Sequence, residues 1–315
     1  MTNPTGVLIL TAFAVCAAVL LLPYLRWRRD RLLHLATFSE VAQTAMGPVE
    51  YVLLGDRGPV VLFVHGTPGS CDQAVAIRGD YRTLAPSRPG FLRTPLSVGE
   101  TPAQQAEAFA ALLDALNIDQ VVVMAASGGG PSGLCFAANY PDRTLGLIAV
   151  ETVAISTTLP RVPALMKLDV VAWLALGAID RLGPDGMSRV LIPDPANRQR
   201  IQAEPANGRL LGALVWAGWP GSLHAGGTDN DANQFRSLAL PLGKITAPTL
   251  IIHGTADINV PLANAEALAA AVQGSRSHII EGADHFMPYT HKGEFDAVVA
   301  EFLSDVFGRQ RSESE

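Results

Sequence analysis

Residues 121–130 read Val-Val-Val-Met-Ala-Ala-Ser-Gly-Gly-Gly, an apolar run that breaks into small residues around one serine. β-Branched residues followed by glycines are typical of a buried strand that enters a sharp turn. Glycine suits such a turn because it adopts backbone conformations that a Cβ atom disfavours. The stretch predicts a strand, a strained corner that exposes the Ser127 hydroxyl, and a helix. The alternative is an ordinary glycine-rich loop.

The segments on either side of this stretch alternate between expected strands and helices. Apolar runs at 60–64, 145–150 and 249–253 predict buried strands, and Thr101-Pro102-Ala103-Gln104 predicts the capped start of a helix. Apolar strands separated by helices form parallel sheets that are covered on both faces. We therefore expect an α/β fold with a mostly parallel central sheet flanked by helices.

The alternation lapses over residues 152–242, where helix-like apolar stretches and prolines appear without strand signals. We expect this segment to be a helical lid, inserted late in the chain. Trp216 and Trp219 would either line an acyl pocket or pack inside the lid. The apolar run 170–179 is too short to span a membrane. It would be buried over a pocket or lie against a membrane surface.

The N-terminal run Gly6–Leu25 carries no charged side chain over 20 positions. As a helix rising about 1.5 Å per residue, it is long enough to cross a bilayer. Four arginines follow within residues 26–31, and this asymmetry places the following domain in the cytoplasm. We expect a single N-terminal membrane anchor, with membrane lipid as a partner. The alternative is a signal peptide that is cleaved on secretion.

These patterns divide the chain into five parts. They are an anchor with its basic flank (1–31), a linker or interfacial helix (32–45), the α/β core (46–151 and 243–308), the lid (152–242) and a disordered tail (309–315). The net charge of -6, without a basic stripe, argues against nucleic acid as a partner. The three cysteines have no metal-like spacing and form no disulfide framework. The pattern does not indicate an oligomeric state.

A serine hydroxyl needs a base to become a nucleophile, and the base needs a partner that fixes its tautomer. Asp257 follows the strand at 249–253, and His285 follows the next expected strand, at 277–280. Because the carboxyl ends of parallel strands meet at one edge of the sheet, both side chains should lie beside Ser127. The order Ser127, Asp257, His285 is the order of the α/β-hydrolase fold.

Over residues 45–307 the chain resembles the α/β-hydrolase superfamily. Four loops carry the resemblance: His65-Gly66-Thr67-Pro68-Gly69, Ser87-Arg88-Pro89-Gly90-Phe91, His253 through Pro261, and Gly282 through Pro288. One position departs from the usual G-x-S-x-G motif, because Ala125 stands where the first glycine is expected. Alanine is small enough to preserve the turn.

The resemblance implies a serine hydrolase that cleaves carboxylic esters through an acyl-enzyme. Ser127, Asp257 and His285 would be the catalytic residues, and the backbone N–H groups of Thr67 and Gly128 would form the oxyanion hole. The substrate would be a small molecule with a hydrophobic acyl group, or a small ester or lactone. Neither a cofactor nor a metal ion is implied.

Other residues near these loops have alternative roles. Glu151, at the end of an earlier strand, could supply the acid in place of Asp257, and Asp284 is interpreted as a turn residue. His65 and His253 are expected to stabilise their loops. Cys71 has no basic partner in view and is not expected to be the nucleophile.

Two alternative functions stay open. One is an aminopeptidase of the proline-releasing type, in which a lid carboxylate such as Glu204 would bind the free amine. The other is a non-catalytic member of the fold that binds a ligand.

Overall fold

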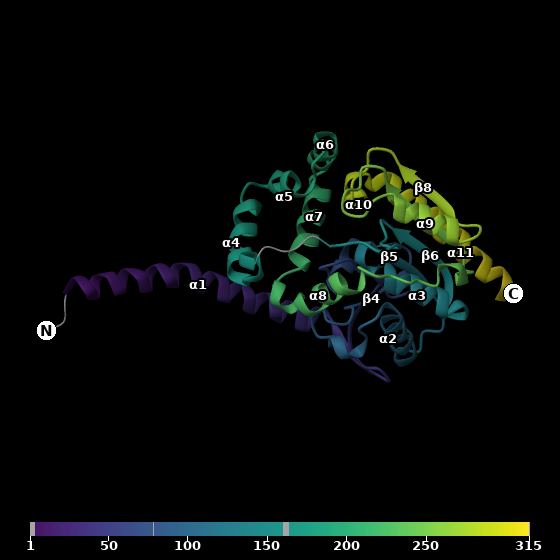
Figure 1. Ribbon diagram of the computed structural model, residues 1–315, viewed down its shortest axis with the longest axis horizontal. Coiled ribbons are helices and arrows are strands. Elements are labelled where there is room, and N and C mark those ends of the chain that lie inside the picture. The colour runs from purple at the N-terminus through teal and green to yellow at the C-terminus, as the bar shows by residue number, and fades with distance from the viewer. Residues whose placement is uncertain (1–3, 78, 160–163, 315) are drawn as a thin grey trace.

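The computed structural model describes residues 4–77, 79–159 and 164–314 (Figure 1). Within them the strands form an eight-stranded sheet in the order β1-β2-β4-β3-β5-β6-β7-β8. β1 pairs antiparallel with β2, and β2 with β4, while the other neighbours are parallel. The strands are β1 (Glu40–Thr44), β2 (Gly47–Leu54), β3 (Val60–Val64), β4 (Arg82–Pro86), β5 (Val121–Ala126), β6 (Thr144–Val150), β7 (Thr249–Gly254) and β8 (Arg276–Ile280). The predicted α/β class with a mostly parallel sheet is confirmed.

The α-helices of the described residues connect these strands or flank them (Figure 1). They are α1 (Pro4–Phe38), α2 (Pro102–Ala115), α3 (Gly130–Asn139), α4 (Asp169–Asp180), α5 (Pro184–Leu191), α6 (Pro195–Ala203), α7 (Pro205–Ala217), α8 (Ala225–Gln234), α9 (Ala263–Ala271), α10 (Met287–Thr290) and α11 (Lys292–Ser314). Helices α4 to α8 all belong to the segment between β6 and β7, which we call the insertion.

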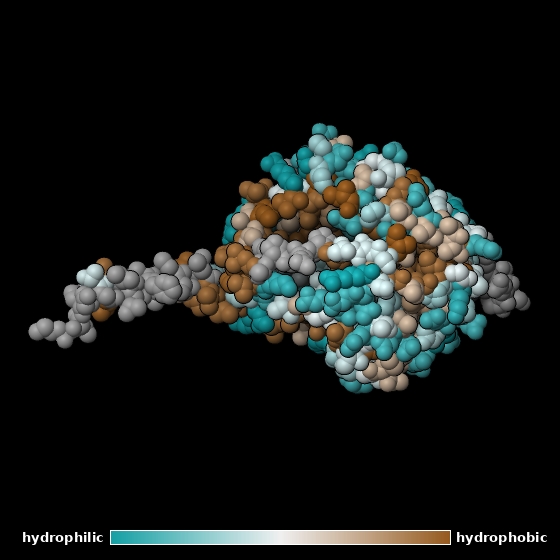
Figure 2. All heavy atoms as spheres, viewed as in Figure 1, coloured by the Kyte–Doolittle hydropathy of each residue, from teal (hydrophilic) through white to brown (hydrophobic). Residues whose placement is uncertain are grey.

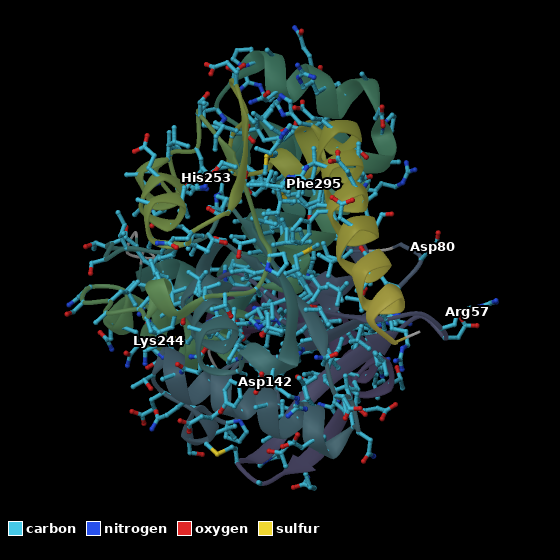
Figure 3. All side chains as sticks on the ribbon, turned by 90° about the vertical axis from the view of Figure 1, so that its right-hand side faces the viewer. Arg57, Asp80, Asp142, Lys244, His253 and Phe295 are labelled. Atoms are coloured by element: carbon cyan, nitrogen blue, oxygen red, sulfur yellow. The ribbon has the colours of Figure 1, made fainter. Side chains whose placement is uncertain are left out.

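Alternate side chains of the central strands enter two separate cores. In β5, Val121, Val123 and Ala125 pack on the side of α2, α3 and α9, whereas Val122 and Met124 pack on the other side. Helix α11, which carries Phe295, covers that second side (Figure 3). A strand buried on both faces reads as a continuous apolar run, which is why 121–126 shows no polar alternation.

The N-terminal helix corrects one expectation. None of the described helices combines the length with the apolar character that crossing a bilayer requires. The predicted membrane anchor is therefore wrong, and so are membrane lipid as its partner and a domain held in the cytoplasm by it. The apolar run 6–25 is only the first part of α1, which continues without interruption through the arginines at 26–31 to Phe38.

The later turns of α1 pack on the domain, while its N-terminal part projects away from it (Figure 1). Arg31 forms an ion pair with buried Asp72 and donates a hydrogen bond of 3.2 Å to the carbonyl of Trp219 in the insertion. The Trp27 ring lies 5.5 Å from that of Trp216 in α7. Trp216 therefore contacts α1, a partner that the sequence did not indicate.

Two further segments differ from the expected division. Residues 32–45, expected to be a linker or an interfacial helix, contain the end of α1 and the edge strand β1. Residues from 309 onward, expected to be a disordered tail, continue α11 as far as Ser314.

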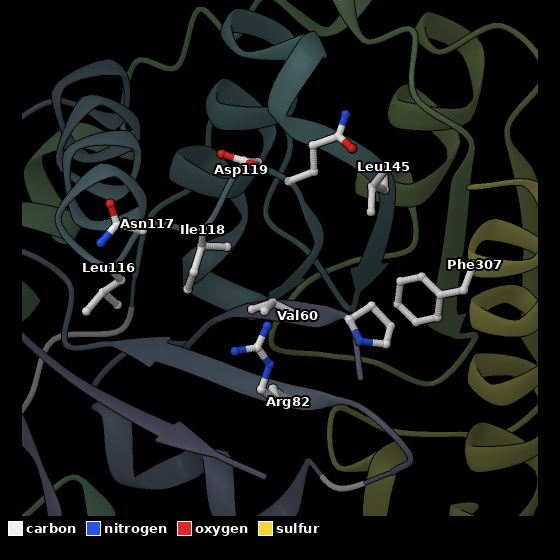
Figure 4. Close-up of a pocket in the computed structure, with 10 residues that line it drawn as sticks. Val60, Arg82, Leu116, Asn117, Ile118, Asp119, Leu145 and Phe307 are labelled. Atoms are coloured by element: carbon white, nitrogen blue, oxygen red, sulfur yellow. The ribbon is translucent and has the colours of Figure 1, made fainter. Parts of the chain in front are cut away.

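A cavity of about 500 Å³ opens at the amino ends of the strands (Figure 4). Val60, which begins β3, and Arg82, which begins β4, line it together with the loop at 116–120. In a parallel sheet the loops after the carboxyl ends of the strands carry the functional groups. The cavity lies at the opposite edge of the sheet, away from those loops.

Candidate active site

Ser127 lies at a strained corner between β5 and α3. Its φ angle is 49°, in the left-handed region that a side chain rarely adopts. A Cβ atom on Gly129 would stand 2.3 Å from the carbonyl oxygen of Val64, and one on Gly128 would stand 2.2 Å from Oγ1 of Thr67. Both glycines are therefore required by the close approach of the β3 loop, as the sequence predicted for a sharp turn.

The unusual alanine two residues before Ser127 is accommodated by α3. Ala125 is fully buried, and a Cβ atom on Gly133 would stand 2.6 Å from the Cβ atom of Ala125. The helix thus lacks a side chain at the point where the strand has one. This explains how the turn keeps its geometry without the usual glycine.

The structure brings Ser127, His285 and Asp257 together. The Ser127 Oγ lies 3.0 Å from Nε2 of His285, and Nδ1 of the same ring lies 2.7 Å from Oδ2 of Asp257. Because a carboxylate only accepts, Nδ1 donates to it, which leaves Nε2 free to accept the serine proton. The three residues come from the loops after β5, β8 and β7, at the carboxyl edge of the sheet.

The Asp257 carboxylate is held from its other side as well. Its Oδ1 accepts hydrogen bonds from the backbone N–H groups of Asn259 (2.8 Å) and Val260 (2.9 Å). The side chain is fully buried, so these bonds fix the carboxylate in one orientation. His253, at the end of β7 (Figure 3), contacts the carbonyl of Val260 through Nε2 at 2.8 Å and so supports this loop.

Thr67 and Gly128 lie side by side next to Ser127. The backbone nitrogen of Thr67 is 3.1 Å from the point where a Cβ atom of Gly128 would stand. His65 holds this loop: its Nε2 accepts the N–H of Arg88 at 2.9 Å, so its Nδ1 donates to the carbonyl of Gly66 at 2.8 Å. Burial, together with the nearby charge of Arg88, lowers the pKa of His65, in keeping with a neutral ring.

Sequence reasoning missed a buried ion pair behind this loop. Both terminal nitrogens of Arg88 bind Asp231 of α8, at 3.0 Å and 2.6 Å, and both side chains are almost completely buried. One of these nitrogens also donates to Oγ1 of Thr67. The motif around Arg88 was visible in the sequence, but nothing in it pointed to Asp231, 143 residues later.

The insertion also contacts the loop that carries His285. Asn197 of α6 donates hydrogen bonds to the carbonyl of Gly282 (2.9 Å) and to Oδ2 of Asp284 (3.2 Å). The other oxygen of Asp284 accepts the N–H of Phe286 at 2.9 Å, as expected of a turn residue. Burial raises the pKa of Asp284.

Glu151, the alternative acid, lies close to this group without bonding to His285. One carboxylate oxygen of Glu151, one of Asp257 and one nitrogen of His285 all lie within 4.8 Å of one another, a spacing that could hold a cation. Glu151 is 4% exposed, and among the described residues its Oε1 has no hydrogen-bond partner. Burial, and then the charges of Asp257 and Asp284, raise the pKa of Glu151 well above its ordinary value.

We expect the Glu151→Gln variant to become more stable than the wild type as the pH rises. In the unfolded chain Glu151 loses its proton near pH 4.5, whereas in the folded protein it keeps the proton to a higher pH. Folding thus binds a proton above pH 4.5, and this lowers the wild-type free energy of unfolding by up to about 1.4 kcal/mol per pH unit. Glutamine cannot ionise and removes this loss.

Urea unfolding of both proteins between pH 5 and pH 8 measures the difference. Glu266→Gln, at an exposed carboxyl of α9, is the matched control and should change with pH like the wild type. If the free energy of unfolding changed with pH in the same way for the wild type and Glu151→Gln, the expectation would be contradicted.

The remaining candidate residues lie outside this group. Burial raises the pKa of Cys71 to about 12, so its thiol stays neutral. Glu204 is exposed before α7, where its carboxylate is 3.4 Å from the side-chain nitrogen of Asn207. The backbone carbonyl of Trp219 accepts a hydrogen bond from Arg31, as described for α1.

Comparison with known proteins gives relatives along most of the chain. The sequence profile of the Alpha/beta hydrolase family matches residues 61–301. An alpha/beta hydrolase fold protein from Nakamurella multipartita has a solved structure with a TM-score of 0.79 and 31% identity, covering 84% of this chain and 98% of that one.

The curated relatives include proteins with hydrolase names. The uncharacterized hydrolase YcgS of Bacillus subtilis is 40% identical over 101 residues, which span 31% of this chain and 35% of that protein. The 2-hydroxy-6-oxononadienedioate/2-hydroxy-6-oxononatrienedioate hydrolase of Klebsiella pneumoniae is 26% identical and covers 79% of this chain and 88% of its own. The fold, the strand-end loops and these matches agree: the chain is a hydrolase and belongs to the alpha/beta hydrolase family.

Proposed function

We propose that this hydrolase cleaves carboxylic esters through an acyl-enzyme formed on Ser127. The observation that carries the proposal is the unbroken set of hydrogen bonds from Ser127 through His285 to Asp257. His285 takes the Ser127 proton on Nε2 while Oγ attacks the ester carbonyl carbon. The negative charge that develops on the carbonyl oxygen is met by the N–H groups of Thr67 and Gly128.

The intermediate then collapses in the direction of the acyl-enzyme. The bond to the alcohol oxygen breaks, and His285 gives its proton to that oxygen, so the alcohol leaves neutral. A water molecule next loses a proton to His285 and attacks the acyl carbon. The carboxylic acid departs, and the proton returns to Ser127.

The burial of Arg88 and its ion pair with Asp231 favour an ester over the substrate of the Klebsiella relative. That relative's name describes a dicarboxylate, and carboxylates are bound best by arginine side chains. Arg88 is beside Thr67, but it is 1% exposed and already binds Asp231 with both terminal nitrogens. Arg88 is therefore not free to bind a substrate carboxylate. A neutral ester does not need such an arginine.

We also propose that the insertion acts as a lid for apolar acyl groups. Apolar side chains gather over α4 and α5, near the point where α1 leaves the domain (Figure 2). Leu174, Leu182 and Val190 are 37%, 69% and 62% exposed there. A groove of about 620 Å³ between α1 and the insertion is lined by Trp27, Trp173 and Trp216, among others. Such a surface favours hydrophobic over charged acyl chains.

A panel of three substrate classes tests the reaction. We expect p-nitrophenyl esters to be turned over, and prolyl p-nitroanilide and 2-hydroxy-6-oxononadienedioate to react at least about 100-fold more slowly. Glu204, one lid carboxylate that could bind the free amine of an aminopeptidase substrate, is exposed and offers no enclosed amine site. Spectrophotometric kcat/KM for each substrate is the measurement. Turnover of the anilide or of the dienedioate without turnover of any ester would contradict the proposal.

A further inference from the structure

Helix α8 of the insertion is fixed to the core at the loop that follows β4. The N–H of Gly227 donates to the carbonyl of Gly90 at 2.8 Å. A Cβ atom on Gly90 would stand 2.5 Å from the backbone nitrogen of Gly227, and one on Gly227 would stand 2.1 Å from the ring of Phe91. This contact leaves no room for a side chain on either glycine, so α8 packs directly against the backbone of the loop.

From that position α8 directs a buried carboxylate at the side chain of Thr67. Oγ1 of Thr67 donates to Oδ2 of Asp231 and accepts a hydrogen bond of 3.0 Å from Arg88. The Asp231 side chain is 2% exposed and the Arg88 side chain 1%. A hydroxyl held between two buried charged groups has one rotamer, because any other leaves a buried polar group without its partner.

Fixing the Thr67 side chain also fixes its backbone. The hydroxyl is two bonds from the Cα atom, and the N–H that faces the oxyanion is attached to the same Cα atom. Arg88 adds a second restraint to the loop, because its Nε donates to the carbonyl of His65 at 2.9 Å. Oxyanion stabilisation depends on donors that are already in place when the charge develops.

We infer that Asp231 is a positioning residue: through Thr67 and Arg88 it aims the Thr67 N–H at the oxyanion, so α8 supports the catalytic site and does not move as a cover. The inference rests on the proposed function. It divides the insertion into a fixed part, α8, and the helices that precede it. It also gives the buried Arg88–Asp231 ion pair, which lies behind the site, a role in positioning the oxyanion loop.

The Thr67→Val variant tests the inference without disturbing the ion pair. Valine keeps the branched shape and loses the hydroxyl, while Arg88 and Asp231 still bind each other. We expect kcat for p-nitrophenyl butyrate to fall about 10- to 100-fold with KM within about 3-fold of the wild type, because a small displacement of an oxyanion donor acts on the transition state. Binding of butylboronic acid, which forms a tetrahedral adduct with serine, should weaken by a similar factor.

Thr67→Ser keeps the hydroxyl and should retain kcat within about 3-fold. Thr94→Val is the matched control, because Thr94 is also buried and its hydroxyl accepts the N–H of Glu50 at 2.9 Å. It should lower the melting temperature about as much as Thr67→Val while leaving kcat unchanged. If the wild type is active and kcat is unchanged in Thr67→Val, the inference is overturned but the proposed function is not. The same holds if Thr94→Val loses as much kcat as Thr67→Val. Wild type without Ser127-dependent ester turnover would overturn the proposed function and the inference with it.

Discussion

The Ser127→Ala variant is expected to lose between about 10³- and 10⁶-fold of kcat for p-nitrophenyl esters, and to lose all labelling by a fluorophosphonate. Removal of Oγ leaves no atom on which the acyl group or the phosphonyl group can form a bond. The Ser127 Oγ donates a hydrogen bond of 3.0 Å to Nε2 of His285, so this oxygen is the group that the imidazole contacts. The residual activity of the variant would come from substrate binding and from the N–H groups of Thr67 and Gly128.

Ser132→Ala is the matched control for this variant. Ser132 is a buried serine five residues later, in α3, and its hydroxyl donates to the carbonyl of Gly129 at 3.2 Å. It should keep both the activity and the label. The measurement is the rate of labelling of pure folded protein, together with kcat. A label that survives Ser127→Ala would contradict the proposed nucleophile, and folded wild type that takes no label would favour the non-catalytic alternative.

The Asp257→Asn variant is expected to lose about 10⁴-fold of kcat while it remains folded. Oδ1 of Asp257 accepts two backbone N–H groups, so an asparagine at this position must keep its carbonyl oxygen there. Its NH₂ group then faces Nδ1 of His285, which has to become an acceptor. The proton moves to Nε2, and His285 can no longer take the proton of Ser127.

Kinetics and ¹⁵N chemical shifts of His285 measure the rate and the tautomer together. Asp284→Asn is the control, because this neighbouring buried carboxyl bonds to Phe286 and Asn197 and not to His285. It should retain kcat within about 10-fold. Activity that persists in Asp257→Asn and disappears only when Glu151 is replaced as well would transfer the role of the acid to Glu151.

Much of the fold could be predicted from local patterns in the sequence. The strand at 121–126, the capped start of α2 at Thr101 and the strand at 249–254 were expected, because hydrophobic runs and caps depend on residues close in sequence. The strand-end positions of Asp257 and His285 were enough to predict that they meet Ser127. Parallel pairing makes such loops neighbours whatever the length of chain between them.

The rest depended on contacts that no local pattern contains. The apolar composition of 6–25 predicted a membrane span, but composition does not tell where a helix continues or what its later turns contact. Asp231 was one carboxylate among many until the fold placed it against Arg88. β1 was missed because five residues of mixed polarity at a sheet edge have no buried face to mark them.

The pairing of Ala125 with Gly133 constrains how this turn can change over time. A side chain at 125 is tolerated because 133 has none, and the two Cβ positions are only 2.6 Å apart. A lineage that carried glycine at 125 and alanine at 133 would have had to lose the side chain on the helix before it gained the one on the strand. The reverse order passes through an overpacked intermediate. The alanine at 125 therefore depends on the glycine at 133, a residue that a motif search limited to the neighbours of the serine does not include.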